Sequence, residues 1–151
     1  MLSKKDLIIL SHFRNDARAS LTSLSKKTSV PVSTLFDKLR KFETDVIKRH
    51  TSLIDFQKLG YDLRVNLMLK IDKEDKPKIE EFLLKNERVN SIFKINNGYD
   101  LLVEGIFTNM KDFQLFTDLI DRFKILGKQE FYILDELKKE GFMADPDMVF
   151  V

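Results

Sequence analysis

The sequence predicts an α+β fold in two parts, a basic helical part followed by an acidic part in which strands and helices alternate. Apolar residues recur at helical spacing over the first 45 residues and at every second position from Val65 to Ile71, which is the periodicity of a strand. Met1–Gly60 holds 12 Lys and Arg against 6 Asp and Glu, whereas Tyr61–Val151 holds 14 against 18, giving +6 and −4. The net positive charge of the first part favours binding to a polyanion.

The composition excludes several classes of protein. The 151 residues make one ordinary domain or two small ones, and 43% hydrophobic with 33% charged residues is typical of a globular chain. Cys is absent and His occurs only at positions 12 and 50, so we expect no catalytic residues, no cofactor and no metal site. No apolar run approaches the roughly 18 residues of a membrane span, and no signal peptide is recognisable, which predicts a cytoplasmic protein.

The pattern of caps and breakers over residues 1–45 predicts a helix-turn-helix. The first helix begins after the cap Ser3 and ends near residues 14–16, and the second begins after Ser20 and ends near residues 27–29. Pro31 then stops helical geometry, because the residue before a proline avoids the α region. We expect Ser33 to cap a third helix, whose buried stripe is Leu35, Leu39 and Phe42 and whose exposed face is Thr34, Asp37, Lys38 and Lys41.

Residues 46–63 are predicted to form a wing or β linker and a hinge. Val46–Ile54 is β-prone with Lys48 and Arg49 at its centre, and residues 55–60 make one helical turn closed by Gly60. The first part is therefore expected to be a winged helix-turn-helix.

The second part, residues 64–137, is predicted to have the order βαββαβ. Asn97-Gly98 is a strong hairpin signal, because a type I′ turn needs positive φ at both central residues. Strands are expected at Arg64–Ile71, Val89–Asn96, Tyr99–Thr108 and Gln129–Leu134, and helices at Lys76–Asn86 and Asn109–Lys124. This order is that of the ferredoxin-like sandwich, in which two helices cover one face of an antiparallel sheet.

The other face of that sheet is expected to be rich in Val, Leu and Ile and to be covered by a second subunit. Residues 138–151 are a tail, and its apolar side chains suggest that it docks on another part of the molecule: Phe142, Met143, Met148 and Phe150.

The order of these parts resembles the leucine-responsive/asparagine-synthetase (Lrp/AsnC) family of transcription regulators. The resemblance covers nearly the whole chain and rests on these pieces: Asp6–Leu10, Asn15–Ser20, Ser33–Leu35 with Lys38–Glu43, Val46-Ile47, Leu59-Gly60 and Gly98–Asp100. The chain departs from the family pattern at Ser29 and Asp45, where glycine is usual, at Lys38, where arginine is usual, and in residues 129–133, which lack the usual threonine.

The resemblance implies a sequence-preferring regulator that binds double-stranded DNA through the third helix and forms homodimers that assemble to octamers on the nucleoid. Ser33, Thr34, Lys38 and Lys41 are candidates for the groove, and Arg40, Lys48 and Arg49 are candidates for phosphate contacts. It also implies an amino-acid-like effector between subunits, near Asn97, Gly98, Tyr99 and Asp100, with Asp100 receiving an ammonium group.

Two other functions fit the same architecture. Sirohaem decarboxylases look like it, although they need basic and His groups that are missing from the acidic second part. An architectural protein that coats DNA without an effector would share the basic first part. At the level of single residues, the cations of the third helix could be a solvated face, and Asp100 could pair locally.

Overall fold

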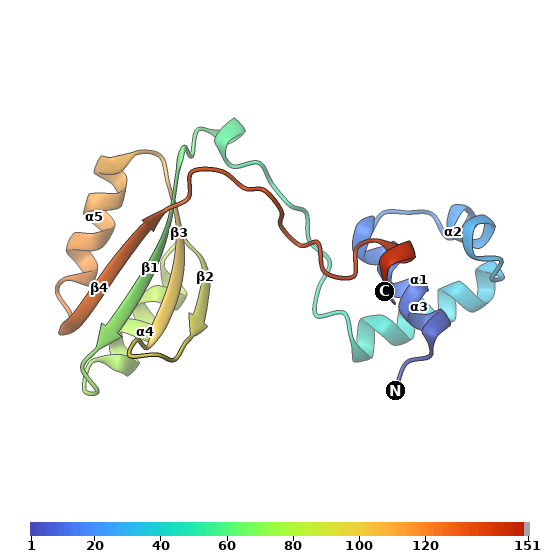
Figure 1. The fold of residues 1–151 in the computed structure, drawn as a ribbon, viewed down its shortest axis with the longest axis horizontal. Helices are drawn as coiled ribbons and strands as arrows, with labels where there is room; N and C mark the ends of the chain where they lie inside the picture. Colours follow the sequence, from blue (N-terminus) through green and yellow to red (C-terminus); the bar gives the residue numbers. More distant parts are fainter. Residues whose placement is uncertain (150–151) are drawn as a thin grey trace. The chain divides into compact units, whose positions relative to one another are not determined.

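The computed structural model describes residues 1–149, which form two compact units (Figure 1). The helical unit is Met1–Leu53 together with the C-terminal segment that starts at Leu137, and the sheet unit is Ile54–Glu136. No helix among the described residues is long and apolar enough to cross a membrane. Phe150, one of the apolar residues expected in the tail, lies outside the described residues.

Three helices build the first unit as the sequence predicts: α1 (Lys4–Asn15), α2 (Leu21–Thr28) and α3 (Val32–Asp45). Ser3 and Asp6 form a capping box at the start of α1, and the side chain of Ser20 caps α2. The core between the helices is made of buried apolar residues from all three helices and the turn: Ile9, Phe13, Leu24, Val30, Leu35 and Phe42.

The turn between α2 and α3 differs from the expectation in one detail. Ser33 does not cap α3, because the helix begins at Val32 and Pro31 occupies the cap position without a side-chain hydrogen bond. Pro31 has its φ fixed near the helical value and can start a helix, so no polar cap is needed to set the first turn. Ser29 closes α2 in the left-handed conformation, with φ 55°.

The expected wing strand is absent from the described structure. Residues 47–55 form no helix and no strand, and the backbone amide of Ile47 bonds instead to the carbonyl of Phe42 at 2.7 Å. A β-prone sequence becomes a strand only beside a partner strand, and this segment pairs with none. The single turn that follows is confirmed as a 3-10 helix, Gln57–Leu59, closed by Gly60 with φ 86°.

The second unit has the predicted βαββαβ order and an antiparallel sheet in the order β2-β3-β1-β4. The last helix ends four residues before the expected Lys124, and the last strand begins four residues before the expected Gln129. The bounds are β1 (Leu63–Ile71), α4 (Lys76–Lys85), β2 (Val89–Lys94), β3 (Leu101–Phe107), α5 (Met110–Ile120) and β4 (Ile125–Tyr132).

One face of the sheet packs on α4 and α5, and it takes the Val, Leu and Ile residues of β1. These alternate along the strand as Val65, Leu67, Leu69 and Ile71, all buried in the core with Ile79 of α4 and Phe116 of α5 among others. The expectation that the open face is rich in Val, Leu and Ile is therefore wrong, because the strand alternation turns those residues toward the helices.

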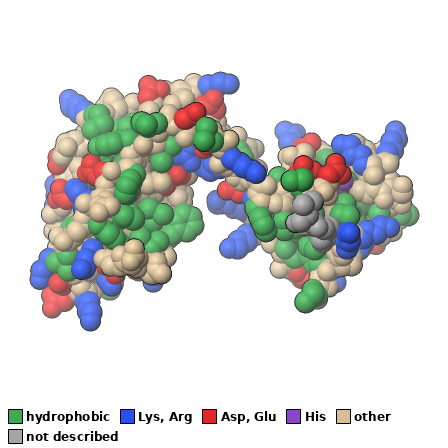
Figure 2. Space-filling model, viewed as in Figure 1, with side chains coloured by type: hydrophobic (Ala, Val, Ile, Leu, Met, Phe, Trp, Pro, Cys, Tyr) green, Lys and Arg blue, Asp and Glu red, His purple; other side chains and the backbone are tan. Residues whose placement is uncertain are grey.

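The open face is mixed in character. A row of apolar side chains crosses it through the paired positions Phe93, Leu102 and Met68. Beside this row Arg64 pairs with Glu104 at 2.9 Å and also with Glu136. Figure 2 shows hydrophobic side chains gathered over the strands in the middle of this face.

The C-terminal segment belongs to the helical unit. The guanidinium of Arg14, at the end of α1, pairs with Glu140 at 2.7 Å and donates to the carbonyl of Phe142 at 2.8 Å. The segment ends in a 3-10 turn, Pro146–Met148, that packs near α1. The tail thus docks as expected, but Phe142 and Met148 remain mostly exposed, so polar contacts from Arg14 contribute to holding it in place.

Candidate nucleic-acid interface

Helix α3 has one buried side and one exposed side. Leu35 and Phe42 are fully buried, and Leu39 packs beside them. Because successive residues turn by about 100° around a helix, positions 33, 37, 40 and 44 point away from that core. All four are exposed, as are their neighbours Thr34, Phe36 and Lys41. The exposed side therefore presents hydroxyl, carboxylate, aromatic and cationic groups along the length of the helix.

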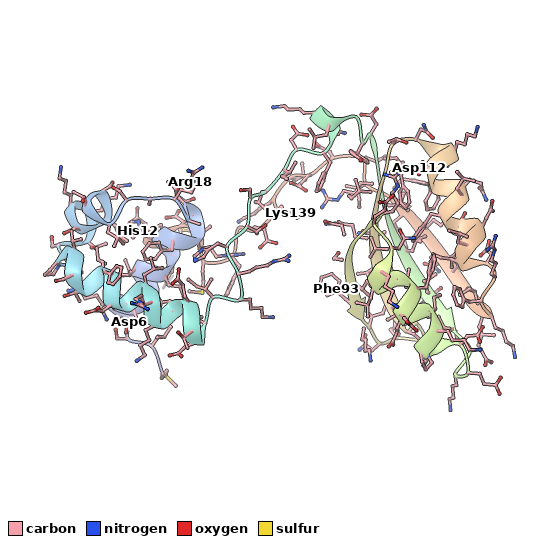
Figure 3. All side chains as sticks on the ribbon, turned by 180° about the vertical axis from the view of Figure 1, so that it is seen from behind. Asp6, His12, Arg18, Phe93, Asp112 and Lys139 are labelled. Atoms are coloured by element: carbon pink, nitrogen blue, oxygen red, sulfur yellow. The ribbon has the colours of Figure 1, made fainter. Side chains whose placement is uncertain are left out.

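Lys38 does not belong to this exposed side. Its ammonium group forms an ion pair with Asp6 of α1, and only 31% of the Lys38 side chain and 16% of the Asp6 side chain are exposed. Figure 3 labels Asp6 in the helical unit. Hydrogen bonds from Lys38 and Ser3 lower the pKa of Asp6 from 3.8 to about 2. The expectation that Lys38 lies on the exposed face is wrong, because its long side chain reaches back to the capping box of α1 and joins the two helices.

The beginning of α3 is accessible. Ser33 and Thr34 are exposed in its first turn, and neither caps the helix. The free backbone N–H groups of a first turn and the helix dipole favour negative charge. The two predicted hydroxyl donors thus sit beside backbone groups that favour a phosphate.

Further along α3, Arg40 lies over the ring of Phe36, with 5.8 Å between the guanidinium carbon and the ring centroid. Phe36 is 49% exposed, although it is a large apolar residue. Arg40 is among the residues predicted to contact phosphates, whereas Phe36 is not among the predicted site residues. The signal was present, because an aromatic residue next to Leu35 falls outside the buried stripe of the helix.

The remaining predicted cations lie after Arg40. Lys41, Lys48 and Arg49 are exposed, and none of them forms an ion pair within residues 1–149. The segment that carries Lys48 and Arg49 is tied back to α3 by His50, whose Nε2 lies 2.9 Å from Oε1 of Glu43. Glu43 lies three residues after Arg40 on α3, and its carboxylate pairs with His50 rather than with Arg40.

The predicted effector residues lie together at one end of the sheet unit. Asn97 and Gly98 have φ of 63° and 85°, as a type I′ turn requires, and both are exposed. Tyr99 and Asp100 are half-buried. Tyr99 is near enough to Gly127 of β4 that a Cβ added to this glycine would lie 3.9 Å from the Tyr99 ring.

The carboxylate of Asp100 already has two partners. Its Oδ1 pairs with the ammonium group of Lys76 at 2.6 Å, and its Oδ2 accepts the backbone N–H of Ile71 at 2.8 Å. Lys76 and this hydrogen bond lower the pKa of Asp100. Asp100 therefore joins the hairpin to the end of β1 and the start of α4. Elsewhere in the described residues, no three His, Cys, Asp or Glu side chains gather as a metal site would require.

No family model matches the chain. It is 26% identical over 147 residues to an uncharacterised HTH-type transcriptional regulator of Pyrococcus abyssi, covering 97% of this chain and 100% of that protein. It is 29% identical over 120 residues to the HTH-type transcriptional regulator FL11 of Pyrococcus horikoshii, covering 79% of this chain and 80% of that protein.

Two solved structures share the fold. One is a transcriptional regulator of Neisseria meningitidis in complex with L-Met, with a TM-score of 0.86, 22% identity and coverage of 92% of this chain and 94% of that chain. The other is LrpC of Bacillus subtilis, with a TM-score of 0.84, 16% identity and coverage of 91% of this chain and 98% of that chain.

Proposed function

Because this chain is a homologue of helix-turn-helix transcriptional regulators and has the fold of the Lrp/AsnC regulators, we propose that it controls transcription by binding duplex DNA through α3. The predicted resemblance is confirmed, and so is the predicted architecture of a helix-turn-helix with a ferredoxin-like domain, except for the wing strand. A regulator of this kind acts as a binding protein rather than an enzyme, in the cytoplasm on the nucleoid.

The observation that carries the proposal is a cluster of three exposed cations at one end of α3, none of which has a carboxylate partner among residues 1–149. Lys41, Lys48 and Arg49 lie at the end of α3 and in the segment that follows it. Salt bridges are abundant elsewhere in the structure, so cations left without them can be neutralised by phosphates. Ser33 and Thr34, at the accessible start of α3, supply hydroxyl groups for base edges or phosphate.

Binding of the full-length chain to fluorescent duplexes over a range of salt concentrations tests this proposal. Lys41→Ala and the pair Lys48→Ala with Arg49→Ala should weaken binding and lower the slope of log K against log salt by about 0.9 for each phosphate that the removed side chains neutralise. Lys111→Ala, an exposed lysine of α5, is the control and should change neither. Wild-type protein that binds no duplex, or variants with unchanged slopes, would contradict the proposal.

We also propose that the open face of the sheet forms a homodimer, from which larger assemblies such as an octamer would grow. Phe93 is 57% exposed and Phe131 is 47% exposed on this face, beside Leu102 and Met68. Exposed aromatic residues in one apolar patch favour a protein interface. Two copies would present two α3 helices to a pseudo-palindromic site.

Sedimentation of the full chain tests the dimer. Phe93→Glu should yield monomers at micromolar concentration, because it places a charge in the apolar row of the proposed interface. Leu84→Glu is the matched control, since Leu84 is 76% exposed on α4, on the helical side of the sheet. A wild-type monomer, or a Phe93→Glu variant that assembles like the wild type, would contradict the proposal.

The complex of the Neisseria regulator with L-Met supports an amino-acid effector here as well. We propose that Asn97, Gly98 and Tyr99 contact it and that Asp100 positions their hairpin through Lys76 and Ile71. Titration calorimetry with the twenty amino acids tests this. Heat from at least one amino acid, abolished in Tyr99→Ala, is the expected result, and no heat from any of them would contradict it.

A further inference from the structure

Arg40 has the aromatic ring of Phe36 as its neighbour and no carboxylate partner among residues 1–149, which distinguishes it from Arg14, Arg64 and Arg88. Arg88 also lies over a ring, that of Tyr61, at 5.6 Å. Arg14, Arg64 and Arg88 each face a carboxylate, at 2.7, 2.9 and 3.3 Å respectively. Arg40 faces an aromatic ring on its own helix, one turn earlier, and makes no ion pair within residues 1–149. Its guanidinium keeps its hydrogen-bond donors available while the ring restricts its movement.

The chemistry around this pair fits base edges better than phosphates. Phe36 is an exposed aromatic residue, and Asp37 beside it is an exposed carboxylate. Neither gains energy from a phosphate, and the carboxylate is repelled by one. A helix side with an aromatic ring, an acid and an arginine is therefore suited to the floor of the major groove, where donors, acceptors and methyl groups are displayed.

We propose that Arg40 and Phe36 form one reading unit for a guanine that neighbours a thymine. Arg40 donates two parallel hydrogen bonds to N7 and O6 of the guanine, and Phe36 packs against the C5 methyl group of the thymine. This inference rests on the proposed binding of duplex DNA through α3, and it adds which bases determine the sequence preference.

The stacked arrangement explains why the two residues act together. A free arginine side chain loses several rotamers when it is fixed on a base, whereas the contact with Phe36 already limits them. The ring also excludes water from one side of the guanidinium, which strengthens its hydrogen bonds. Arg40→Lys keeps the charge but loses the planar fork, so it should lose the guanine preference.

Selection from a randomised duplex library with the full-length chain provides the site on which the proposal is tested. The wild-type site should contain a thymine and guanine step that Arg40→Lys no longer selects. In the selected duplex, 7-deazaguanine removes N7 and deoxyuridine removes the methyl group. We expect the first change to weaken wild-type binding about ten-fold and the second about four-fold.

Variants of Arg40 and Phe36 test which residue contacts which base. Arg40→Lys should be insensitive to 7-deazaguanine, and Phe36→Ala should be insensitive to deoxyuridine. Lys41→Ala is the matched control, because it should bind more weakly with a smaller salt slope and keep the full sensitivity to both modified bases.

The outcomes separate this inference from the proposed function. Wild-type protein that binds no duplex contradicts both. Duplex binding with the same selected site in wild type and Arg40→Lys contradicts only the reading unit. A Phe36→Ala variant that changes the sedimenting species and retains sensitivity to deoxyuridine would show that the ring serves a protein interface, and it would overturn the proposal.

Discussion

Lys38 of α3 and Asp6 of α1 form a partly buried ion pair that joins two helices of the helical unit. Asp6 is also the acceptor of the capping box that starts α1, because its carboxylate receives the backbone N–H and the hydroxyl of Ser3. One carboxylate thus holds both the beginning of α1 and the middle of α3. The contact adds to the core packing of Leu35 and Phe42 in holding α3 against α1.

Breaking the pair from either side should destabilise the helical unit. Lys38→Met leaves the half-buried carboxylate of Asp6 without its cation, and we expect a loss of about 1 kcal/mol in the free energy of unfolding. The double variant Asp6→Asn with Lys38→Met should lose less than the sum of the single losses, as denaturation of all four proteins would show. Strictly additive losses would mean that the pair contributes nothing.

The same pair predicts a loss of stability in acid. The pKa of Asp6 is about 2 in the folded chain and 3.8 as the ordinary value, so folding favours the ionised form. Its contribution is complete above the ordinary value and disappears as the pH falls from about 4 to 2, by about 1 kcal/mol after allowance for solvent screening. The amide NMR signals of α1 and α3, followed during acid titration, should show this loss of stability. Asp6→Asn should flatten this part of the pH profile, and an unchanged profile would contradict the assignment.

Replacing Ser29 by glycine should stabilise the helical unit. Its φ of 55° is unfavourable for a residue with a Cβ, and glycine adopts that conformation freely. Ser29→Gly should raise the free energy of unfolding of the helical unit by about 0.5–1 kcal/mol. Ser25→Gly, inside α2, is the control and should lower it by about 0.5 kcal/mol. A loss of stability in Ser29→Gly would show that the hydroxyl has a role the backbone does not reveal.

The hairpin contact of Asp100 predicts a structural effect in the sheet unit. Asp100→Asn weakens the contact with Lys76 and with the N–H of Ile71, and should lower the stability of the unit by about 1 kcal/mol. Hydrogen exchange of the Ile71 amide should become faster, whereas that of Leu67 in the middle of β1 should not change. If exchange at Ile71 is unaffected, the carboxylate does not hold the hairpin.

The contacts of Arg14 predict that this residue holds the C-terminal segment on the helical unit. Arg14→Ala removes the pair with Glu140 and the hydrogen bond to the carbonyl of Phe142, so the amide of Met148, bonded to Asp145 at 3.1 Å, should exchange faster. Arg18→Ala, an exposed arginine without a contact to this segment, is the control. Equal exchange in both variants would mean that other contacts hold the tail.

Local signals in the sequence were sufficient for most of the fold. Ser3 and Ser20 cap helices as expected, and Asn97-Gly98 turns with positive φ at both residues. Features that depend on a partner distant in the sequence could not be predicted in this way. Val46–Ile54 has the composition of a strand, but strand formation requires a neighbouring strand that the described chain does not supply.

The residue types of α3 were sufficient to predict a candidate interface, but the contacts of the long side chains were not predictable from them. Lys38 and Lys41 are both lysines near the exposed side of α3, yet only the side chain of Lys38 meets a carboxylate, which is 32 residues away in the sequence. Phe36 was missed because an aromatic residue in an amphipathic helix is usually assigned to the core. Phe36 is exposed because its side chain points away from the core, and the periodicity of apolar residues indicates that direction only approximately.

The proposal that duplex DNA binds on the exposed side of α3 can be tested by the salt dependence of binding in matched variants. Full-length wild type, Lys41→Ala and Lys111→Ala are titrated with one duplex at several salt concentrations. We expect Lys41→Ala to lower the slope of log K against log salt by about 0.9 and Lys111→Ala to leave it unchanged. Equal slopes in all three proteins would show that Lys41 neutralises no phosphate and would contradict DNA binding on this side of α3.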